Sequence, residues 1–575
     1  MEQERLITSS GDPGAESAAP PSSPPRKKPE VRWSDLPNKD QLFLLAICRL
    51  SEPLSNVCLL PYIFYLVRSV LPRDPDSNTD STASATPGAS ESESARISEY
   101  SGLLVASFPL AQFAVSLAWG YISDARGRRP SILLGLLVSV VANAAFGLSR
   151  SLGALFFWRT LAGVANGNVG LMRGMTAEVV RERRFQTKAF LLLPLVFNSG
   201  MVFSLAVGGI LADPVTNLPW AFGPRGFLNF AGGEKGVAWA VEYPYALPGL
   251  MNAGMLGTAL VLSWLWLAET LPGKEGTSDI GLRAGGFLVR LARNVCGVRD
   301  HTKYMPVADE EAPSTPGTST PPSPASTAEA GEATKPSSSP VGAGPISEKP
   351  PPRAARLPFR KIFTRDVLTA MVAFGLLPLH NSAFMHIFPV YLSTPPAAPD
   401  TPHTLLSFTG GLGLRSSAIG LWLSAFGVGG ILLQLFIYPR IQGRVGTLGV
   451  LRIALVIFPA VYVLAPYLSL AAGAARWAGL GLVICGQIAA RTMAIPSTVI
   501  LLTEAAPAKN VLGTVHGAGN MLVSLARAVG PAVGGVVFAW GVENGVVGAV
   551  WWMYLVCVAL VALTWTFTLQ RSVEE

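Results

Sequence analysis

Long apolar runs separated by short polar segments recur along almost the whole chain. A helix that crosses the hydrocarbon core of a bilayer, which is about 30 Å thick, needs about 20 predominantly apolar residues. Twelve runs approach or exceed this length, at residues 41–70, 100–122, 131–149, 152–176, 188–211, 245–268, 366–393, 416–438, 448–470, 475–503, 511–540 and 546–568. The pattern predicts an all-α, polytopic membrane protein with twelve transmembrane helices.

The polar segment 269–365 separates the sixth run from the seventh. It contains a run rich in Pro, Ser, Thr, Ala and Gly, residues 312–352, that cannot bury enough apolar surface to fold on its own. The twelve helices therefore divide into two bundles of six. The predicted domains are a disordered cytoplasmic N-terminus (1–40), a first six-helix bundle (41–268), a largely disordered cytoplasmic linker (269–365), a second six-helix bundle (366–568) and a short cytoplasmic tail (569–575).

Composition and charge agree with a lipid environment. Half of the 575 residues are hydrophobic, 14% are charged and the mean hydropathy is +0.41, values unlike those of a soluble domain. Basic residues cluster in loops on one side of the expected topology, at 126–129, 181–188, 283–303, 353–365 and 440–444. Because basic loops stay in the cytoplasm, both termini are predicted to be cytoplasmic and the acidic loop 73–96 to be disordered on the opposite side. The net charge of +8 reflects these topology signals, so no nucleic-acid partner is expected.

The sequence argues against several other kinds of chemistry. Its five cysteines are scattered, with no CxxC pair and no histidine at metal-ligand spacing, so no metal site is expected. A phosphate-binding G-x-x-x-x-G-K-[ST] loop is absent, which disfavours transport driven by ATP. No cluster of catalytic carboxylates, histidines or cysteines lies near a membrane surface. We therefore expect neither an enzyme nor a bound cofactor.

The segment between the second and third runs carries the most specific motif. Gly120, Asp124, Gly127, Arg128 and Arg129 have the spacing G-x-x-x-D-x-x-G-R-R. This resembles the signature loop of the major facilitator superfamily, and the resemblance implies two six-helix bundles that move a solute by alternating access. A carboxylate and several guanidinium groups beside a tight glycine turn can lock or release helix ends. A solvated charge cluster that only anchors the topology is the alternative reading, especially for Arg129.

The fourth run is similar to a second motif of the same superfamily, in which an arginine precedes glycines within the helix. Here Arg159 precedes Gly163 and Gly167, and Asn168 follows. A buried arginine costs about 2.5–3.5 kcal/mol even on lenient insertion scales, so Arg159 is expected to face a cavity or a partner. Snorkelling of its side chain to the nearby outer interface is the alternative.

The first run contains a candidate proton-coupling group. Arg49 and Glu52 are three residues apart on one helical face, and a carboxyl desolvated in a cavity can exchange a proton for a substrate. A static pair that fixes helix packing is the alternative. Together with residues 243–248, which enter the sixth run, and 269–272, which leave it, this segment resembles the zinc-induced facilitator-like branch of fungi and plants and the drug:proton antiporters. The resemblance implies a plasma-membrane or vacuolar location.

Small residues recur in the fifth and eleventh runs, where they are predicted to let helices pack closely. They are Gly200, Gly208 and Gly209 in the fifth run and Gly530, Pro531, Gly534 and Gly535 in the eleventh. The superfamily's antiporter motif, G-x-x-x-G-P-x-x-G-G, is incomplete, because Ser204 and Leu205 stand where its second glycine and its proline belong. This departure weakens the assignment as an antiporter and does not affect the fold.

The remaining polar side chains within apolar runs are candidates to line a central path. They are His380, Asn381, His386, Gln487, Arg491, Asn520 and Arg527, and a purely structural role is the alternative for the histidines. His380 and His386 are six residues apart and do not share a helical face well, so a metal site built from both is not expected.

An inner gate is predicted at the cytoplasmic helix ends. Glu178 and Glu504 are expected to pair there with loop arginines such as Arg128, Arg183 and Arg444 and to open when the bundles rock apart.

These features predict a monomeric secondary transporter that moves a small solute by proton-coupled antiport and has protons and bilayer lipids as its other partners. The alternative is a non-transporting membrane sensor that keeps the fold and signals through the linker, which offers phosphorylation sites such as Ser323 before Pro324. The substrate and the direction of transport stay open.

Overall fold

A computed structural model describes residues 35–72, 87–180, 182–271, 279–296, 359–398, 401, 403–507 and 511–574, and these residues are predominantly helical. Strand pairing among these residues is limited to one isolated bridge between Pro396 and Gly410. The helices of the first half are α1 (Lys39–Arg49), α2 (Ser51–Asn56), α3 (Ile63–Val70), α4 (Pro87–Arg126), α5 (Arg128–Gly147), α6 (Leu152–Ala165), α7 (Val169–Val179), α8 (Arg183–Leu211), α9 (Pro214–Asn217), α10 (Pro219–Phe222), α11 (Ala238–Glu242), α12 (Ala246–Trp266) and α13 (Ile280–Cys296). Those of the second half are α14 (Phe359–Ile362), α15 (Arg365–Ser393), α16 (Ser416–Leu432), α17 (Tyr438–Leu464), α18 (Gly473–Glu504), α19 (Leu512–Glu543) and α20 (Cys557–Glu574).

Eight helices within the described residues are long and apolar enough to cross a membrane. One of them, Ser416–Ser469, covers two predicted spans, so the eight account for nine of the predicted twelve. The first, fourth and fifth predicted spans do not meet that criterion. The prediction of an all-helical, polytopic membrane protein is confirmed.

Two of these three spans are interrupted. The first breaks at Leu50 and again over residues 57–62, where Pro61 supplies no backbone N–H for a helical hydrogen bond. The fourth is interrupted by a 3₁₀ turn over Asn166–Asn168. Each interruption leaves backbone polar groups inside the bundle that need other partners.

Helices extend beyond the predicted spans in three places. Helix α4 begins at Pro87, so residues 87–96 are not a loop, and Ala95 in that extension is fully buried. Helix α13 lies within the linker, and α20 runs through most of the predicted tail, to Glu574. The composition of 87–96 is polar, but its buried Ala95 belongs to an apolar cluster that also contains Ile387 and Phe388 of the second half. The disorder predicted for 1–34, 73–86 and 297–358 lies outside the described residues.

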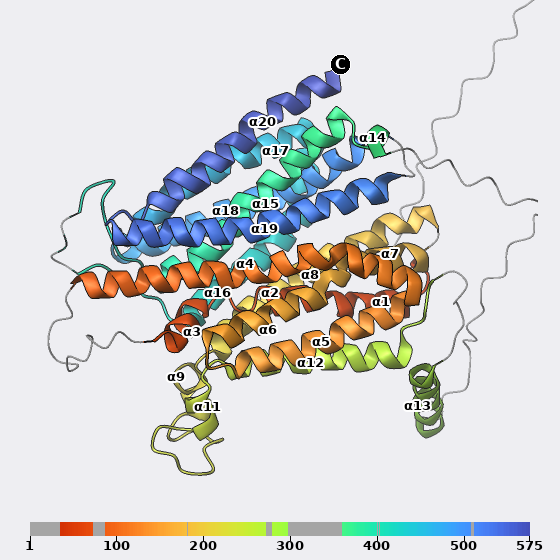
Figure 1. Cartoon of the computed structure of the whole chain (residues 1–575), viewed down its shortest axis with the longest axis horizontal. Coiled ribbons are helices and arrows are strands. Elements are labelled where there is room, and N and C mark those ends of the chain that lie inside the picture. The colour runs from red at the N-terminus through yellow and green to blue at the C-terminus, as the bar shows by residue number, and fades with distance from the viewer. Residues whose placement is uncertain are drawn as a thin grey trace, which may run out of the picture.

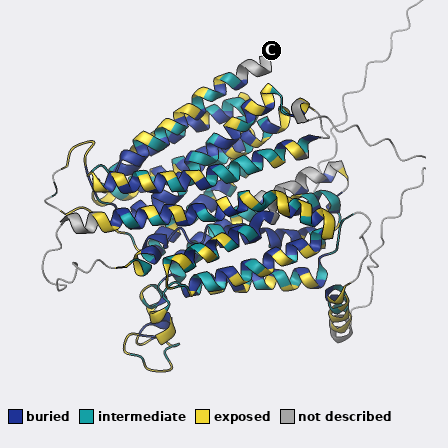
Figure 2. Cartoon of the chain, in the orientation of Figure 1, coloured by how far each residue is buried: buried dark blue, intermediate teal, exposed yellow. Residues whose placement is uncertain are grey.

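The long helices run roughly along one direction (Figure 1). Helices α5, α6 and α12 lie together on one side, and α17, α19 and α20 lie on the other. We call the end that carries the α4–α5 connector the inner end and the end that carries α9 and α11 the outer end. Helix α1 begins at the inner end, where the Asn38 side chain donates to the carbonyl of Val179 (3.1 Å), and α20 ends there too. Exposed residues are frequent on the outer faces of the helices (Figure 2), among them Leu117, Leu134 and Leu421.

The two halves meet along two contacts near the outer end, which we call the outer seams. In the α4–α19 seam, a Cβ added to Gly102 would lie 2.6 Å from the Pro531 carbonyl oxygen and 3.0 Å from the Cα of Gly535. In the α8–α16 seam, a Cβ added to Gly209 would lie 2.9 Å from the Cα of Gly420. Backbones can approach this closely only where side chains are absent. The seams therefore close the outer end of the space between the halves.

Candidate functional site

An open cavity of about 1150 Å³ lies between the two halves. Its walls come from α2, α4, α7 and α8 of the first half and from α15, α18 and α19 of the second. Lining residues such as Arg173, Val499 and Asn520 lie toward the inner ends of their helices, whereas Leu60 and Val105 lie nearest the outer seams. The cavity is thus accessible from the inner end and closed at the outer end.

One carboxylate links the two halves beside this cavity. Glu52 on α2, with 2% of its surface exposed, accepts from Arg49 Nη1 at 2.5 Å and from Arg527 Nη1 at 2.8 Å. Arg527 belongs to α19 in the second half. The Arg49 guanidinium also stacks over the Phe197 ring, with its Cζ 5.2 Å from the ring centre. A change in the charge of Glu52 would therefore act directly on an ion pair that joins the halves.

The cavity walls carry three guanidinium groups, those of Arg173, Arg491 and Arg527, and no Asp or Glu among the described lining residues. Arg491 donates to the sulfur of Met201 at 3.3 Å, and within the described chain this is its one hydrogen bond. Arg173 has no hydrogen bond or ion pair with any described residue. The cavity surface is therefore strongly basic.

The predicted path residues divide into two groups. Asn381, Arg491 and Arg527 line the cavity. His380 does not, because it is fully buried within the second half, where it shares a hydrogen bond with the Tyr462 hydroxyl (2.7 Å). Gln487 lies behind the wall and donates to Asn381 Oδ1 at 3.2 Å. Of Asn168, the structure describes the backbone turn and not the side chain.

Arg159 is buried, with 3% of its surface exposed, so it does not snorkel to the outer interface. It donates to the carbonyl oxygens of Ser55 and Asn56 and, at 2.9 Å, to Asn56 Oδ1. These carbonyls lie at the end of α2, where the interrupted helix leaves them without helical partners. Arg159 therefore supplies hydrogen bonds to the carbonyl groups left unpaired by the break in the first span.

Replacing Arg159 with leucine is expected to lower the free energy of unfolding by about 1–3 kcal/mol, because it leaves buried carbonyl groups unpaired. Thermal unfolding of the full chain in detergent measures this loss. Arg150→Leu is the matched control, since Arg150 pairs with Glu242 at the exposed outer surface, where solvent screens ion pairs and they contribute little to stability. Equal destabilisation by the two substitutions would contradict the assignment.

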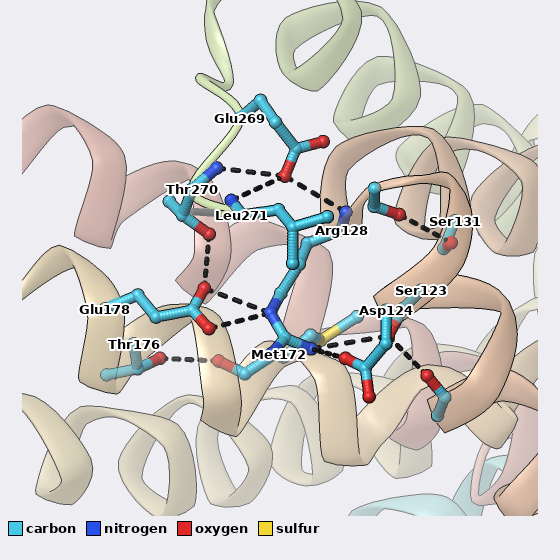
Figure 3. Close-up of polar contacts among 12 residues, drawn as sticks. Ser123, Asp124, Arg128, Ser131, Met172, Thr176, Glu178, Glu269, Thr270 and Leu271 are labelled. Carbon is cyan, nitrogen blue, oxygen red and sulfur yellow. Dashed lines mark hydrogen bonds and ion pairs between the residues drawn. The ribbon is translucent and has the colours of Figure 1, made fainter. Parts of the chain in front are cut away.

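The predicted gate motif forms a compact polar network at the inner end (Figure 3). Arg128 Nε donates to Glu178 on α7 at 2.8 Å, and its Nη1 lies 3.2 Å from Asp124. Glu269 accepts from the backbone N–H groups of Arg128 (3.0 Å) and Arg129 (3.1 Å), so its carboxylate caps the start of α5. Gly127 has a φ of 121°, and a Cβ there would lie 2.5 Å from Glu269 Oε2. Position 127 therefore favours glycine both for its positive φ and for the lack of space for a side chain. Gly120, in contrast, has open space around it.

Arg129 extends the network to the linker. Its guanidinium donates to Asp279, just before α13, and to the Trp264 carbonyl at 2.6 Å. The hydrogen bond from Arg129 lowers the pKa of the Asp279 carboxyl below its usual range. With 4% of its surface exposed, Arg129 is not a solvated topology anchor.

Among its described residues, the second half has no equivalent network in this conformation. Glu504 and Arg444 are both exposed, and neither forms an ion pair with another described residue. The predicted pairing of Glu504 with Arg444 is therefore not formed here.

Replacing Arg128 with glutamine is expected to lower the free energy of unfolding by about 1–3 kcal/mol, because the half-buried pair with Glu178 is lost. Asp124→Asn is the control, because the Asp124 side chain is 68% exposed and its pair with Arg128 is well solvated. Thermal unfolding again gives the comparison. An effect of Asp124→Asn as large as that of Arg128→Gln would argue against a structural role for the Arg128–Glu178 pair.

One charged residue that lines the cavity, Arg173, was not predicted from the sequence. Arg173 stands within the predicted fourth span, and an arginine inside an apolar run was the signal that could have identified it. His386 and Asn520, which were among the predicted candidates, also line the cavity. The predicted packing glycines lie at close helix contacts: Gly200 against Pro53, Gly208 against Cys58, Gly530 against the Leu379 carbonyl and Gly534 against Ile387.

Comparisons with known proteins agree with this architecture. The family model described as Major Facilitator Superfamily matches residues 81–396. The chain is 32% identical over 534 residues, 92% of this chain and 83% of the relative, to the major facilitator superfamily multidrug transporter mfsB of Aspergillus fumigatus. It is 23% identical to protein ZINC INDUCED FACILITATOR 1 of Arabidopsis thaliana, over 87% of this chain and 84% of the relative. A solved D-xylose-proton symporter shares the fold at 13% identity, with a TM-score of 0.56 over 92% of this chain and 97% of that one. The chain is a non-enzymatic transporter of the major facilitator superfamily.

Proposed function

We propose that the chain moves a small solute through the cavity by alternating access and couples this movement to protons at Glu52. The observation that carries the proposal is the position of Glu52, which is buried beside the cavity and joined to both Arg49 and Arg527. An ionisable group inside a membrane protein costs free energy to bury. Where one is retained, it commonly marks a substrate or proton path. The name of the 32% identical relative, a multidrug transporter, supports a small organic solute.

Protonation of Glu52 supplies the coupling. The ionised carboxylate attracts Arg527 across the gap between the halves, and in a site shielded from water this attraction is stronger than at a surface. A proton on Glu52 removes the negative charge and weakens this link. The halves can then rock, opening the outer seams while the inner ends approach one another.

The inner ends would close through charged pairs in the opposite conformation. Glu504 and Arg444, both exposed and unpaired among the described residues, are available for such contacts. Charge reversal at Glu504 is therefore expected to alter transport kinetics without affecting membrane insertion. Unchanged kinetics in Glu504→Arg would count against this gate.

The sign of the coupling depends on the solute. Proton antiport, the predicted mode, follows if the solute and the proton exclude each other at Glu52. Cotransport follows if the solute draws Arg527 away from Glu52, because the carboxylate then binds a proton more readily. In both modes the movement of the solute is linked to that of a proton.

Solute flux in proteoliposomes with an imposed pH gradient tests the proposal. A panel of anionic, neutral and cationic organic solutes is offered to the full chain, and solute uptake is recorded together with internal pH. The proposal expects at least one solute to accumulate against its gradient while protons move. If every solute only equilibrates, and the rate of solute uptake does not depend on the pH gradient, the proposal of proton coupling is wrong.

Orientation, membrane and assembly complete the proposal. The basic inner connectors support an inner end that faces the cytoplasm, by the positive-inside rule. We further propose a monomer in the plasma membrane or a vacuolar membrane. The sensor alternative depends on residues 312–352, which lie outside the described part of the chain.

A further inference from the structure

The charges around the cavity do not balance. Arg49, Arg173, Arg491 and Arg527 contribute four positive charges, and among the described residues Glu52 is the one carboxylate in contact with any of them. Four minus one leaves an excess of three positive charges. Removing like charges from water without a counter-charge is costly, so an excess of this size at the centre of a membrane protein needs an explanation.

The polar groups that face the cavity are also short of partners. Arg173 has no hydrogen bond with any other described residue, and Arg491 reaches only the weak acceptor sulfur of Met201. His386, with 1% of its surface exposed, lines the cavity with neither ring nitrogen hydrogen-bonded. Three donors from both halves therefore lack strong acceptors in the same space.

Much of the remaining wall is apolar. Val57, Phe197, Leu377, Met385 and Ile495 come from both halves and line the same cavity as the guanidinium groups. Such a lining suits a ligand with a hydrocarbon or aromatic body, because a few placed polar groups orient it and the apolar walls supply affinity.

We propose that the cavity binds an amphipathic organic anion, with a carboxylate, sulfonate or phosphate group held between Arg173 and Arg491 and an apolar body against the surrounding wall. Guanidinium groups match these oxyanions in geometry and can donate to them in pairs. The anion supplies the counter-charge that the protein lacks. We assign the site to a free solute; the headgroup of an anionic lipid has the same chemistry and is distinguished in the test.

One consequence of this inference rests on the proposed function: whether an anionic solute moves in the same direction as the proton or in the opposite direction. A negative charge in the cavity competes with Glu52 for Arg527 and disfavours the ionised carboxylate. By linkage, the anion and the proton then favour each other's binding. An anionic solute is therefore carried together with a proton, whereas exchange applies to a solute that competes for Glu52.

Ligand-induced thermal stabilisation of the purified full chain in neutral detergent tests the binding site without requiring transport. The probes are 2-naphthoate and its uncharged counterpart 2-naphthamide, which share the same ring system. We expect naphthoate to raise the unfolding temperature and naphthamide to have no comparable effect. Arg173→Gln and Arg491→Gln should each weaken naphthoate binding by about tenfold or more, whereas Arg290→Gln, exposed on α13 and outside the cavity, should not.

The behaviour of the variants without ligand separates a binding role from a structural one. If the two cavity arginines are uncompensated charges, Arg173→Gln and Arg491→Gln should unfold at the same or a higher temperature than the unaltered chain. Marked destabilisation of both would instead indicate structural arginines and would overturn the proposal. Equal stabilisation by naphthoate and naphthamide would overturn it too.

Two further measurements are stabilisation of the chain by phosphatidylglycerol and flux of the panel of solutes. Stabilisation by phosphatidylglycerol with no response to naphthoate would assign the site to a lipid headgroup and contradict a free solute. Proton-linked flux of cationic or neutral solutes alone would refute the anion and leave the proposed transport function intact. Naphthoate binding without flux of any solute would support the site and refute the transport function.

Discussion

Replacing Glu52 with glutamine is expected to abolish accumulation of solute against its gradient while leaving downhill flux in place. Glutamine has nearly the shape of a protonated glutamate but cannot release a proton, so solute movement loses its link to the pH gradient. We expect the ratio of internal to external solute reached with the pH gradient to fall by about tenfold or more. A tenfold change in this ratio corresponds to about 1.4 kcal/mol of free energy. The measurement is solute uptake into proteoliposomes with and without a pH gradient.

Glu543→Gln provides a matched control, because Glu543 is an exposed carboxylate at the outer end of α19. This variant should accumulate solute as the unaltered chain does. If Glu52→Gln still concentrates solute in response to the pH gradient, the proton binds elsewhere and the account of Glu52 fails.

Replacing Gly209 with leucine is expected to prevent closure of the α8–α16 seam and to reduce flux by about tenfold or more. The seam leaves no room for a side chain, since even a Cβ would lie 2.9 Å from the Cα of Gly420 and closer still to the Ser416 carbonyl. Packed helices tolerate little added volume. The variant should therefore favour the conformation that opens outward.

Accessibility of a cavity cysteine measures this shift. Ser382→Cys, which lines the cavity, is introduced into a background without the native cysteines and is treated from the outer side with a membrane-impermeant thiol reagent. Labelling should be faster with Gly209→Leu than without it. Gly254→Leu is the control, because Gly254 is exposed on α12 with no atom within 4 Å of an added Cβ. Slow labelling with normal flux in Gly209→Leu would mean that the seam does not close the cavity.

The sequence predicts the membrane-spanning architecture because hydrocarbon imposes a length and an apolar composition on each helix. It does not predict the breaks. Residues 57–62 lie within the first apolar run, where Pro61 is a local signal, and the break there is stabilised by Arg159, which lies about 100 residues further along the chain. A tertiary contact of this kind has no local signal. The helical extension at 87–96 escaped prediction for the same reason, since its composition is polar and its Ala95 belongs to an apolar cluster shared with the second half.

The candidate site divides in the same way. The spacing of Arg49 and Glu52 places both on one helical face, and the structure shows their ion pair. The pairing of Glu52 with Arg527, across 475 positions of sequence, requires the two halves to be placed together first. The choice between the two histidines of α15 also depends on tertiary packing. His380 faces Tyr462 inside the second half, whereas His386 reaches the cavity.

Paired distance measurements across both ends of the molecule test alternating access most directly. Spin labels are placed in one pair across the outer ends of α8 and α16 and in a second pair across the inner ends of α7 and α18, with Glu52 unaltered and with Glu52→Gln. Loss of the Glu52 charge should lengthen the outer distances and shorten the inner distances in the same population of molecules. Distances that stay constant, or that lengthen at both ends together, would contradict the account.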